Sequence, residues 1–256
     1  MEKSGKELVQ KVFSENKKAY VKSKTHAKGV DLMAIPHWLN LNVEDKLLDV
    51  ATGGGHVAKI VSPYVKQVFA VDLTKDMLEE AAKHLKSLSN IHYIVADAES
   101  LPFLNNTFDH VVCRIAAHHF TSPYQFLKEV SRVLKPGGSF LLIDNIAPEN
   151  ASLDSFINSL EKLRDSSHNR SLKKSEWAHF LQEVQFTIMK EKERKKTLPF
   201  QDWLSRTLSD KTMQEQVYNF VLGADKAILK HYQVDHTRGK IDSIGLDEWM
   251  VLCEKL

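Results

Sequence analysis

The sequence of 256 residues contains only two cysteines, Cys113 and Cys253, and both lie in apolar stretches. Two isolated cysteines do not supply a disulfide framework or a four-ligand zinc site, so we expect buried free thiols and no bound metal. No apolar run approaches the roughly 18 residues of a membrane span, and the charged start MEKSGKELVQ lacks the apolar stretch of a signal peptide. These absences predict a cytoplasmic protein without integral membrane contact.

An excess of charge is also missing, because 35 basic residues stand against 33 acidic ones and the formal net charge is +2. A dedicated nucleic-acid binder usually carries a strong basic excess, so we expect no nucleic-acid partner. Hydrophobic residues make up 43% of the chain, which is enough to form a buried core. The length fits one large domain with additional segments, and the sequence leaves the oligomeric state open.

Five short apolar runs predict buried strands. They are almost continuously hydrophobic, which is typical of parallel strands that helices cover on both faces. Amphipathic segments lie between them, such as residues 74–88 and residues 123–134, where Ser122 and Pro123 form a helix-start signal. This alternation predicts an α/β fold with a doubly wound, mostly parallel sheet. The five runs are KLLDVA, QVFAVDL, IHYIVA, HVVCRIA and GSFLLIDN.

Further segments flank these runs. Residues 1–43 predict a helical N-terminal lid segment, and residues 44–256 the main domain. Two later strands are expected at 185–195 and 241–255, and the helical stretch between them, about 198–235, predicts an inserted cap, because a hairpin needs only a few residues. The basic run KEKERKK at 190–196 predicts a solvated strand edge.

The stretch LLDVATGGGHVAKIV, residues 47–61, breaks an apolar strand with three glycines and then resumes a helical pattern. Such a turn brings a ligand close to bare backbone. Gly53, Gly55 and Ala58 fit the dinucleotide fingerprint, and Asp72 follows at a suitable distance. Taken alone, the stretch fits NAD, S-adenosylmethionine or a purely structural turn.

Three carboxylates at the ends of successive predicted strands favour S-adenosylmethionine. Asp49 suits the cationic methionyl end of that cofactor, whereas it would repel a pyrophosphate. Asp72 has two oxygens for the ribose hydroxyls. Asp97 can accept from the adenine amino group, while the Ala98 N–H donates to a ring nitrogen. The ends of parallel strands are where such folds bind ligands.

Five motifs in this order resemble the class I S-adenosylmethionine-dependent methyltransferases, and within them the ubiquinone/menaquinone-biosynthesis type (methyltransferase type 11). The resemblance covers about residues 45–145. It implies a Rossmann-like methyltransferase fold with a seven-stranded sheet whose last strand is antiparallel. It also implies S-adenosylmethionine as cofactor and S-adenosylhomocysteine as product. The motifs are LLDVATGGGHVA, VFAVDLTKDMLEEA, YIVADAESLPF, FDHVVCRIAAHHF and VLKPGGSFLLIDN.

The same resemblance implies a role for each cofactor residue. The methionyl-binding loop contains Asp49, Ala51, Gly53 and Gly55. Asp72 binds the ribose, Leu73 packs on the adenine face, and the adenine edge is contacted by Asp97 and Ala98. The methyl-donor pocket is bordered by Arg114 and Ile115. Ala51 departs from the family, which usually has glycine there, and this departure puts cofactor affinity in question.

Catalytic candidates follow the fourth predicted strand. An acidic acceptor such as a phenol benefits from a general base, and the motif AAHHF supplies His118 and His119. We expect one of them, preferably His119, to contact the substrate and the other to be structural. Tyr20 is a third candidate, as a lid residue. Candidates to line an apolar acceptor pocket are Phe13, Trp38, Trp177, Phe200 and Trp203.

The sequence thus predicts methyl transfer to a small-molecule acceptor, such as a phenol or a quinone-type compound, by in-line displacement. Two alternatives stay open. One is a non-catalytic protein that binds S-adenosylmethionine with the same fold. The other is an NAD-dependent oxidoreductase, which only the local glycine pattern favours.

Overall fold

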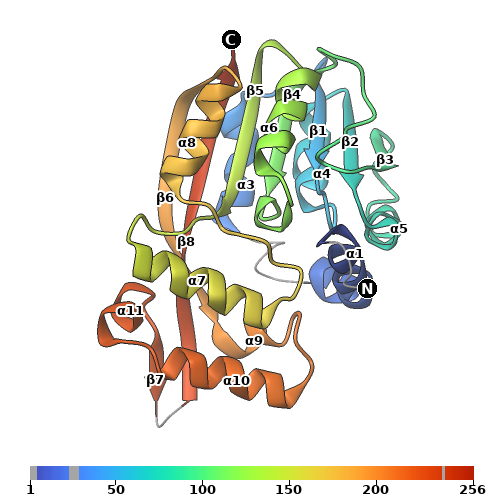
Figure 1. Ribbon diagram of the computed structural model, residues 1–256. Coiled ribbons are helices and arrows are strands. Elements are labelled where there is room, and N and C mark those ends of the chain that lie inside the picture. The colour runs from blue at the N-terminus through green and yellow to red at the C-terminus, as the bar shows by residue number, and fades with distance from the viewer. Residues whose placement is uncertain (1–4, 23–28, 238–239) are drawn as a thin grey trace.

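The computed structural model describes residues 5–22, 29–237 and 240–256. Its strands are β1 Lys46–Val50, β2 Gln67–Asp72, β3 Ile91–Val95, β4 Phe108–Arg114, β5 Leu134–Asn145, β6 Phe186–Pro199, β7 Asp235–Thr237 and β8 Lys240–Lys255. They form one sheet in the order β3-β2-β1-β4-β5-β8-β6, and the short β7 pairs with β8 (Figure 1). β1 to β5 run parallel, and β8 is antiparallel to both β5 and β6. The predicted α/β fold with a mostly parallel sheet and an antiparallel last strand is confirmed, but the described sheet has eight strands instead of seven, because the short β7 pairs with β8.

Helices cover both faces of the sheet, as the apolar strands require. The described α-helices of the protein are α1 Gly5–Lys22, α3 Val30–Leu39, α4 His56–Val61, α5 Lys75–His84, α6 Pro123–Val133, α7 Ala151–Arg164, α8 Lys174–Glu183, α9 Phe200–Leu204, α10 Lys211–Leu222 and α11 Lys226–His231. The core on one face includes Ile35 of α3 and Val61 of α4. The core on the other face includes Phe126 of α6 and Trp177 of α8. In the described residues, no helix combines the length and the apolar character that a membrane span needs.

The long strands β6 and β8 extend past the rest of the sheet and carry a second group of helices at their far ends (Figure 1). α9, α10 and α11 lie between β6 and β8 in the chain, where the sequence predicts the inserted cap. Together with α7 they form a core of their own, which includes Phe156, Trp203 and Tyr232. One side of this helical group therefore faces the end of the sheet.

The two helices described in the N-terminal segment, α1 and α3, have different positions. α3 buries Leu32 and Ile35 in the core beneath the sheet. α1 lies against α5, near the ends of β1 and β2 (Figure 1). Gln10 donates from Nε2 to the Leu73 carbonyl at 3.0 Å, and Lys17 pairs with Asp76 at 3.4 Å. Of the segment 1–43, α1 is thus the helix placed as a lid would be. The predicted boundary at residue 43 stays a prediction.

Candidate functional site

A cavity opens at the carboxyl ends of β1, β2, β3 and β4, and its volume is about 1000 Å³ when the space open to solvent is counted. Most of the residues predicted to bind the cofactor line this one cavity. Gly55 and His118 are not among its lining residues, and the predicted Tyr20 lies outside the part of the chain whose side chains are described. The predicted residues that line it are Asp49, Ala51, Gly53, Asp72, Leu73, Asp97, Ala98, Arg114, Ile115 and His119.

The loop after β1 has left-handed backbone at Ala51, Gly53 and Gly55, with φ of 55°, 54° and 77°. Glycine adopts this conformation without steric cost, which accounts for the glycine that the related family usually has at position 51. A Cβ on Gly55 would meet Leu85 Cδ1 at 2.7 Å, whereas a Cβ on Gly53 would find its nearest atom at 3.8 Å. Gly55 is therefore required by packing against the end of α5, and Gly53 by the backbone turn at the cavity.

Asp49 lies at the end of β1, buried beneath the glycine loop. Its Oδ2 accepts from the Thr52 hydroxyl at 2.5 Å and from the Ala58 N–H at 3.1 Å. Burial, together with the nearby Asp72 carboxylate, raises the pKa of Asp49 to about 7. A cation in the cavity would lower this pKa, because it favours the ionised form. The site thus suits a positively charged group beside Asp49.

Asp72 ends β2 and organises the same loop. Its Oδ2 accepts from the Gly53 N–H at 2.9 Å, and its Oδ1 accepts from the Thr74 N–H at 2.8 Å. Burial raises the pKa of this carboxyl, although the two backbone donors oppose the shift. Each oxygen of a carboxylate has two lone-pair sites, so both oxygens retain one for a ligand hydroxyl. This arrangement matches the predicted contact with two ribose hydroxyls.

Asp97 follows β3, and α1 reaches it across the cavity. Lys6 donates from Nζ to Asp97 Oδ2 at 2.6 Å and pairs with Glu99 Oε2 at 2.8 Å. Glu99 in turn accepts from the Thr121 N–H at 2.7 Å. The carboxylate predicted to read adenine is therefore held by a lysine of α1. The sequence indicated neither Lys6 nor Glu99, because their pairing joins segments far apart in the chain.

Arg114 and Ile115 lie where β4 ends. Arg114 donates from Nε to Asp31 Oδ2 at 2.6 Å, which ties β4 to α3. Ile115 has φ 53°, a strained conformation for a β-branched residue. Such strain persists where the surrounding structure imposes it and is concentrated at functional sites. The observed strain supports the predicted place of Ile115 beside the reacting groups.

His118 forms a buried pair with Asp144 of β5. Its Nδ1 lies 2.6 Å from Asp144 Oδ1, and its backbone N–H donates to Oδ2 at 3.0 Å. Burial alone would lower the pKa of His118, but the Asp144 carboxylate raises it above its usual value. Both contacts of His118 with Asp144 are buried, as expected of a structural histidine.

His119 has a different environment. Its Nδ1 lies 3.0 Å from the Ser167 carbonyl oxygen, which can only accept, so Nδ1 carries the proton and Nε2 is unprotonated. Nε2 has no hydrogen-bond partner in the described part of the chain. Burial, and next the charge of His118, lower the pKa of His119 to about 4. The Phe13 ring of α1 packs edge-on against it, with ring centroids 5.1 Å apart. His119 is thus a neutral histidine with a free acceptor nitrogen.

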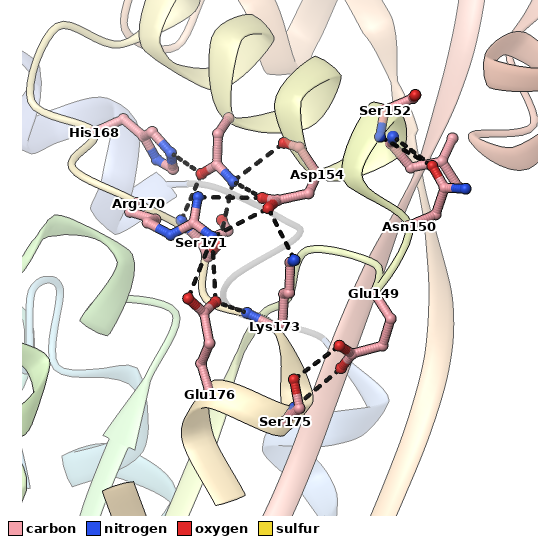
Figure 2. Close-up of polar contacts among 12 residues, drawn as sticks. Glu149, Asn150, Ser152, Asp154, His168, Arg170, Ser171, Lys173, Ser175 and Glu176 are labelled. Carbon is pink, nitrogen blue, oxygen red and sulfur yellow. Dashed lines mark hydrogen bonds and ion pairs between the residues drawn. The ribbon is translucent and has the colours of Figure 1, made fainter. Parts of the chain in front are cut away.

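The loop between α7 and α8 holds both histidines in place. On its inner side the Asn169 and Arg170 N–H groups donate to the His118 carbonyl at 2.9 and 3.0 Å. Figure 2 shows its other side, where Arg170 bridges Asp154 of α7 and Glu176 of α8. This network fixes the loop between two helices, and it therefore also fixes the Ser167 carbonyl that orients His119.

A second cavity, of about 450 Å³ when the space open to solvent is counted, adjoins the first and shares Phe13, Ile115 and His119 with it. Its lining includes His118, Lys196 and Trp203. Two sequence-based expectations need correction here. Of the five aromatics predicted for the acceptor pocket, Phe13 and Trp203 line the second cavity, whereas Trp38, Trp177 and Phe200 pack against or within the hydrophobic cores. The run 190–196 is not wholly a solvated edge, because the Lys196 side chain is only 11% exposed.

The comparisons with known proteins agree with this geometry. A family model described as a methyltransferase domain matches residues 48–142. The uncharacterized methyltransferase YcgJ of Bacillus subtilis is 37% identical over 80% of this chain and 82% of its own length. The crystal structure of a proposed methyltransferase of Bacillus halodurans superposes with a TM-score of 0.86 at 38% identity, covering 89% of this chain and 99% of that one.

A methyltransferase of ubiquinone and menaquinone biosynthesis also matches part of the chain. The ubiquinone/menaquinone biosynthesis C-methyltransferase UbiE of Wigglesworthia glossinidia is 33% identical over 42% of this chain and 45% of its own length. Because that match is partial, it indicates the type of domain but not the methyl acceptor. The matched family region holds the glycine loop, all three strand-end carboxylates and both histidines. The chain belongs to the class I S-adenosylmethionine-dependent methyltransferases.

Proposed function

We propose that this methyltransferase methylates a small-molecule acceptor that binds in the second cavity, with His119 as the general base. The observation that carries the proposal is the position of His119, which lines both the cavity of strand-end carboxylates and the adjoining second cavity. A general base that lies between the methyl donor and the methyl acceptor is in position to take the proton that the acceptor loses on methylation. A phenol-type acceptor, which loses a proton on methylation, suits this placement.

The residues of the first cavity fit S-adenosylmethionine, which supplies the methyl group from its sulfonium when bound. Asp49, with its raised pKa, accommodates the cationic methionyl end, and Asp72 has lone pairs left for the ribose hydroxyls. Asp97 and Ala98 would hold the adenine edge. The protein mainly aligns the acceptor and excludes water, since orientation alone can supply about 7 kcal/mol or more.

We expect a screen with S-adenosylmethionine labelled in its methyl group to find an acceptor in a pool of small metabolites. The protein should transfer label to at least one compound with an ionisable hydroxyl group, because His119 is placed to accept its proton. His119→Gln protein serves as the control and should transfer much less label. Tight cofactor binding with no labelled product across a broad pool would contradict the proposed acceptor class.

We also propose that α1 acts as a lid, because Lys6 occupies the carboxylate that adenine would use. The Lys6→Met variant should speed amide hydrogen exchange of α1 in the free protein by about two- to fivefold, as expected for the loss of partly exposed ion pairs. Lys11→Met is the matched control, because within the described part of the chain this exposed lysine pairs with Glu15 of the same helix, at 3.9 Å, and with no other acidic residue. In the wild type, S-adenosylhomocysteine should slow exchange of α1. Exchange that responds neither to Lys6→Met nor to the ligand would refute the lid.

A further inference from the structure

The loop after α7 links His119 to a buried carboxylate through one serine. The hydroxyl and the backbone N–H of Ser167 both donate to Asp165 Oδ1, the N–H at 2.9 Å. The same hydroxyl oxygen lies 3.2 Å from His119 Nδ1, and the Ser167 carbonyl oxygen lies 3.0 Å from it. All three residues are buried, with exposed fractions of at most 8%. A continuous chain of hydrogen bonds thus runs from the carboxylate to the imidazole.

Asp165 determines the direction of the hydrogen bond between Ser167 and His119. A hydroxyl has one proton to donate, and the Ser167 hydroxyl donates it to Asp165 Oδ1. Towards His119 its oxygen can then only accept, so two oxygens of Ser167 hold the imidazole proton on Nδ1. Without Asp165 the hydroxyl could turn and donate to Nδ1, which would favour the other tautomer. A general base at Nε2 needs Nε2 to be unprotonated.

Hydrogen bonding alone does not explain the negative charge of Asp165. Its Oδ1 accepts from both donors of Ser167, while its buried Oδ2 has no hydrogen-bond partner in the part of the chain that the structure describes. Arg164 Nη2 lies 3.8 Å from Oδ2 and donates to Glu161 at 2.8 Å. An asparagine could accept from both donors with its single oxygen and would avoid the cost of a buried charge. A positive charge that forms on His119 during the reaction gives the carboxylate a use.

The two adjacent histidines differ in how a carboxylate acts on them. Burial would lower the pKa of His118, but direct contact with Asp144, at 2.6 Å, raises it. Asp165 contacts His119 only through Ser167. Burial, and next the charge of His118, lower the pKa of His119 to about 4, although Asp165 and Asp144 oppose this lowering. His119 is therefore neutral before the reaction, while a carboxylate is in place to favour its protonated form.

We propose that Asp165 and Ser167 are positioning residues for His119, which hold its proton on Nδ1 and stabilise the imidazolium that forms during methyl transfer. In that step the acceptor oxygen bonds to the methyl carbon, its proton moves to Nε2, and the electron pair of the breaking sulfur–carbon bond stays on sulfur. Neither residue is among those that line the two cavities, so both act through His119. The inference rests on the proposed function, because it needs His119 as the base.

Kinetics with an acceptor from the labelling screen tests the inference. Asp165→Asn keeps an oxygen for Ser167 and removes the charge, so kcat should fall by roughly ten- to a hundredfold while the affinity for S-adenosylhomocysteine stays unchanged. Ser167→Ala removes one of the two acceptors of Nδ1 and should lower kcat by about two- to tenfold. Ser166→Ala, which removes the hydroxyl of the exposed neighbouring serine, is the matched control and should leave kcat unchanged.

Combination with His119→Gln shows whether Asp165 acts through His119. In the His119→Gln background, Asp165→Asn should cause no further loss of kcat, because the group that it supports is already missing. A full additional loss in that background would overturn the inference. Wild-type turnover in a folded Asp165→Asn enzyme, beside a slow His119→Gln enzyme, would overturn it too. Wild-type turnover in His119→Gln itself would instead refute the proposed function.

NMR of protein labelled with 15N at histidine needs no acceptor and tests the inference on the wild type even if Asp165→Asn does not fold. The His119 signals are assigned by their absence from His119→Gln. At pH 7 wild-type His119 should carry its proton on Nδ1. At pH 4.5, close to the pKa of about 4, the protonated fraction should be smaller in folded Asp165→Asn than in the wild type. A proton on Nε2 in the wild type at pH 7, or equal protonated fractions at pH 4.5, would contradict the assigned roles.

Discussion

The His119→Gln variant should turn over about 10²–10⁴ times more slowly than the wild type, the loss expected when a general base is removed. Its affinity for S-adenosylhomocysteine should stay nearly unchanged, because the cofactor-binding carboxylates are untouched. The physical reason is the free Nε2 of a neutral histidine between two cavities. The nearby Asp165 carboxylate favours the protonated form of His119, so it would stabilise the imidazolium once the proton has been transferred. Steady-state kinetics with an acceptor from the labelling screen measures the effect.

The pH dependence of kcat separates the two histidines. With the pKa of His119 at about 4, this residue stays unprotonated from neutral pH down to about 5, so at saturating cofactor it contributes no fall in kcat over that range. The pKa of His118 is raised above its usual value by Asp144, so a base at His118 would make kcat rise with pH in the range above about 6.5. His118→Gln is the matched variant. A His119→Gln enzyme with wild-type turnover, beside an inactive and folded His118→Gln enzyme, would reverse the assignment.

The Asp72→Ala variant should bind S-adenosylhomocysteine roughly ten- to a hundredfold more weakly. Hydrogen bonds to a charged group contribute about 1.5–3 kcal/mol, and about 1.4 kcal/mol corresponds to a factor of ten. The same change frees the Gly53 and Thr74 N–H groups, so the glycine loop loses its anchor and the melting temperature should also fall.

Asp72→Asn separates these two effects, because its amide retains one oxygen that can accept from the backbone while the charge is lost. We expect a smaller loss of melting temperature than in Asp72→Ala and an intermediate affinity. Calorimetry and thermal unfolding on both variants check this. A folded Asp72→Ala protein with unchanged affinity would show that the ribose is held by other groups.

Features set by local sequence patterns could be predicted. Continuous apolar runs gave parallel strands, and strand-end carboxylates then had to meet at one edge of the sheet, which is why Asp49, Asp72 and Asp97 line one cavity. The helix cap at Ser122 was predicted from the serine and proline at the start of the helix. In the structure the Ser122 side chain accepts from the Gln125 N–H at 3.3 Å. These features depend on residues close in sequence or on the general geometry of parallel sheets.

Features that depend on long-range pairing could not be predicted. The Lys6–Asp97 contact joins residues 91 positions apart, and the Arg194–Asp31 contact joins residues 163 positions apart. The sequence alone made the run 190–196 look solvated, because nothing local indicates that Asp31 and Glu248 would draw Arg194 and Lys196 inward. The two adjacent histidines of AAHHF are distinguished only by their partners, Asp144 from β5 and Ser167 from a later loop.

The most direct test of the cofactor site is a calorimetric titration of the wild type with S-adenosylhomocysteine and, separately, with NAD. We expect S-adenosylhomocysteine to bind and NAD to be inert, because a pyrophosphate would meet Asp49 and Asp72. The pKa of Asp49 is about 7, and the ammonium of the ligand should lower it. Binding near pH 7 should therefore release protons, seen as an enthalpy that changes with the ionisation enthalpy of the buffer, and the affinity should weaken as the pH falls below 7. Tight binding of NAD, with no heat from S-adenosylhomocysteine, would contradict the account.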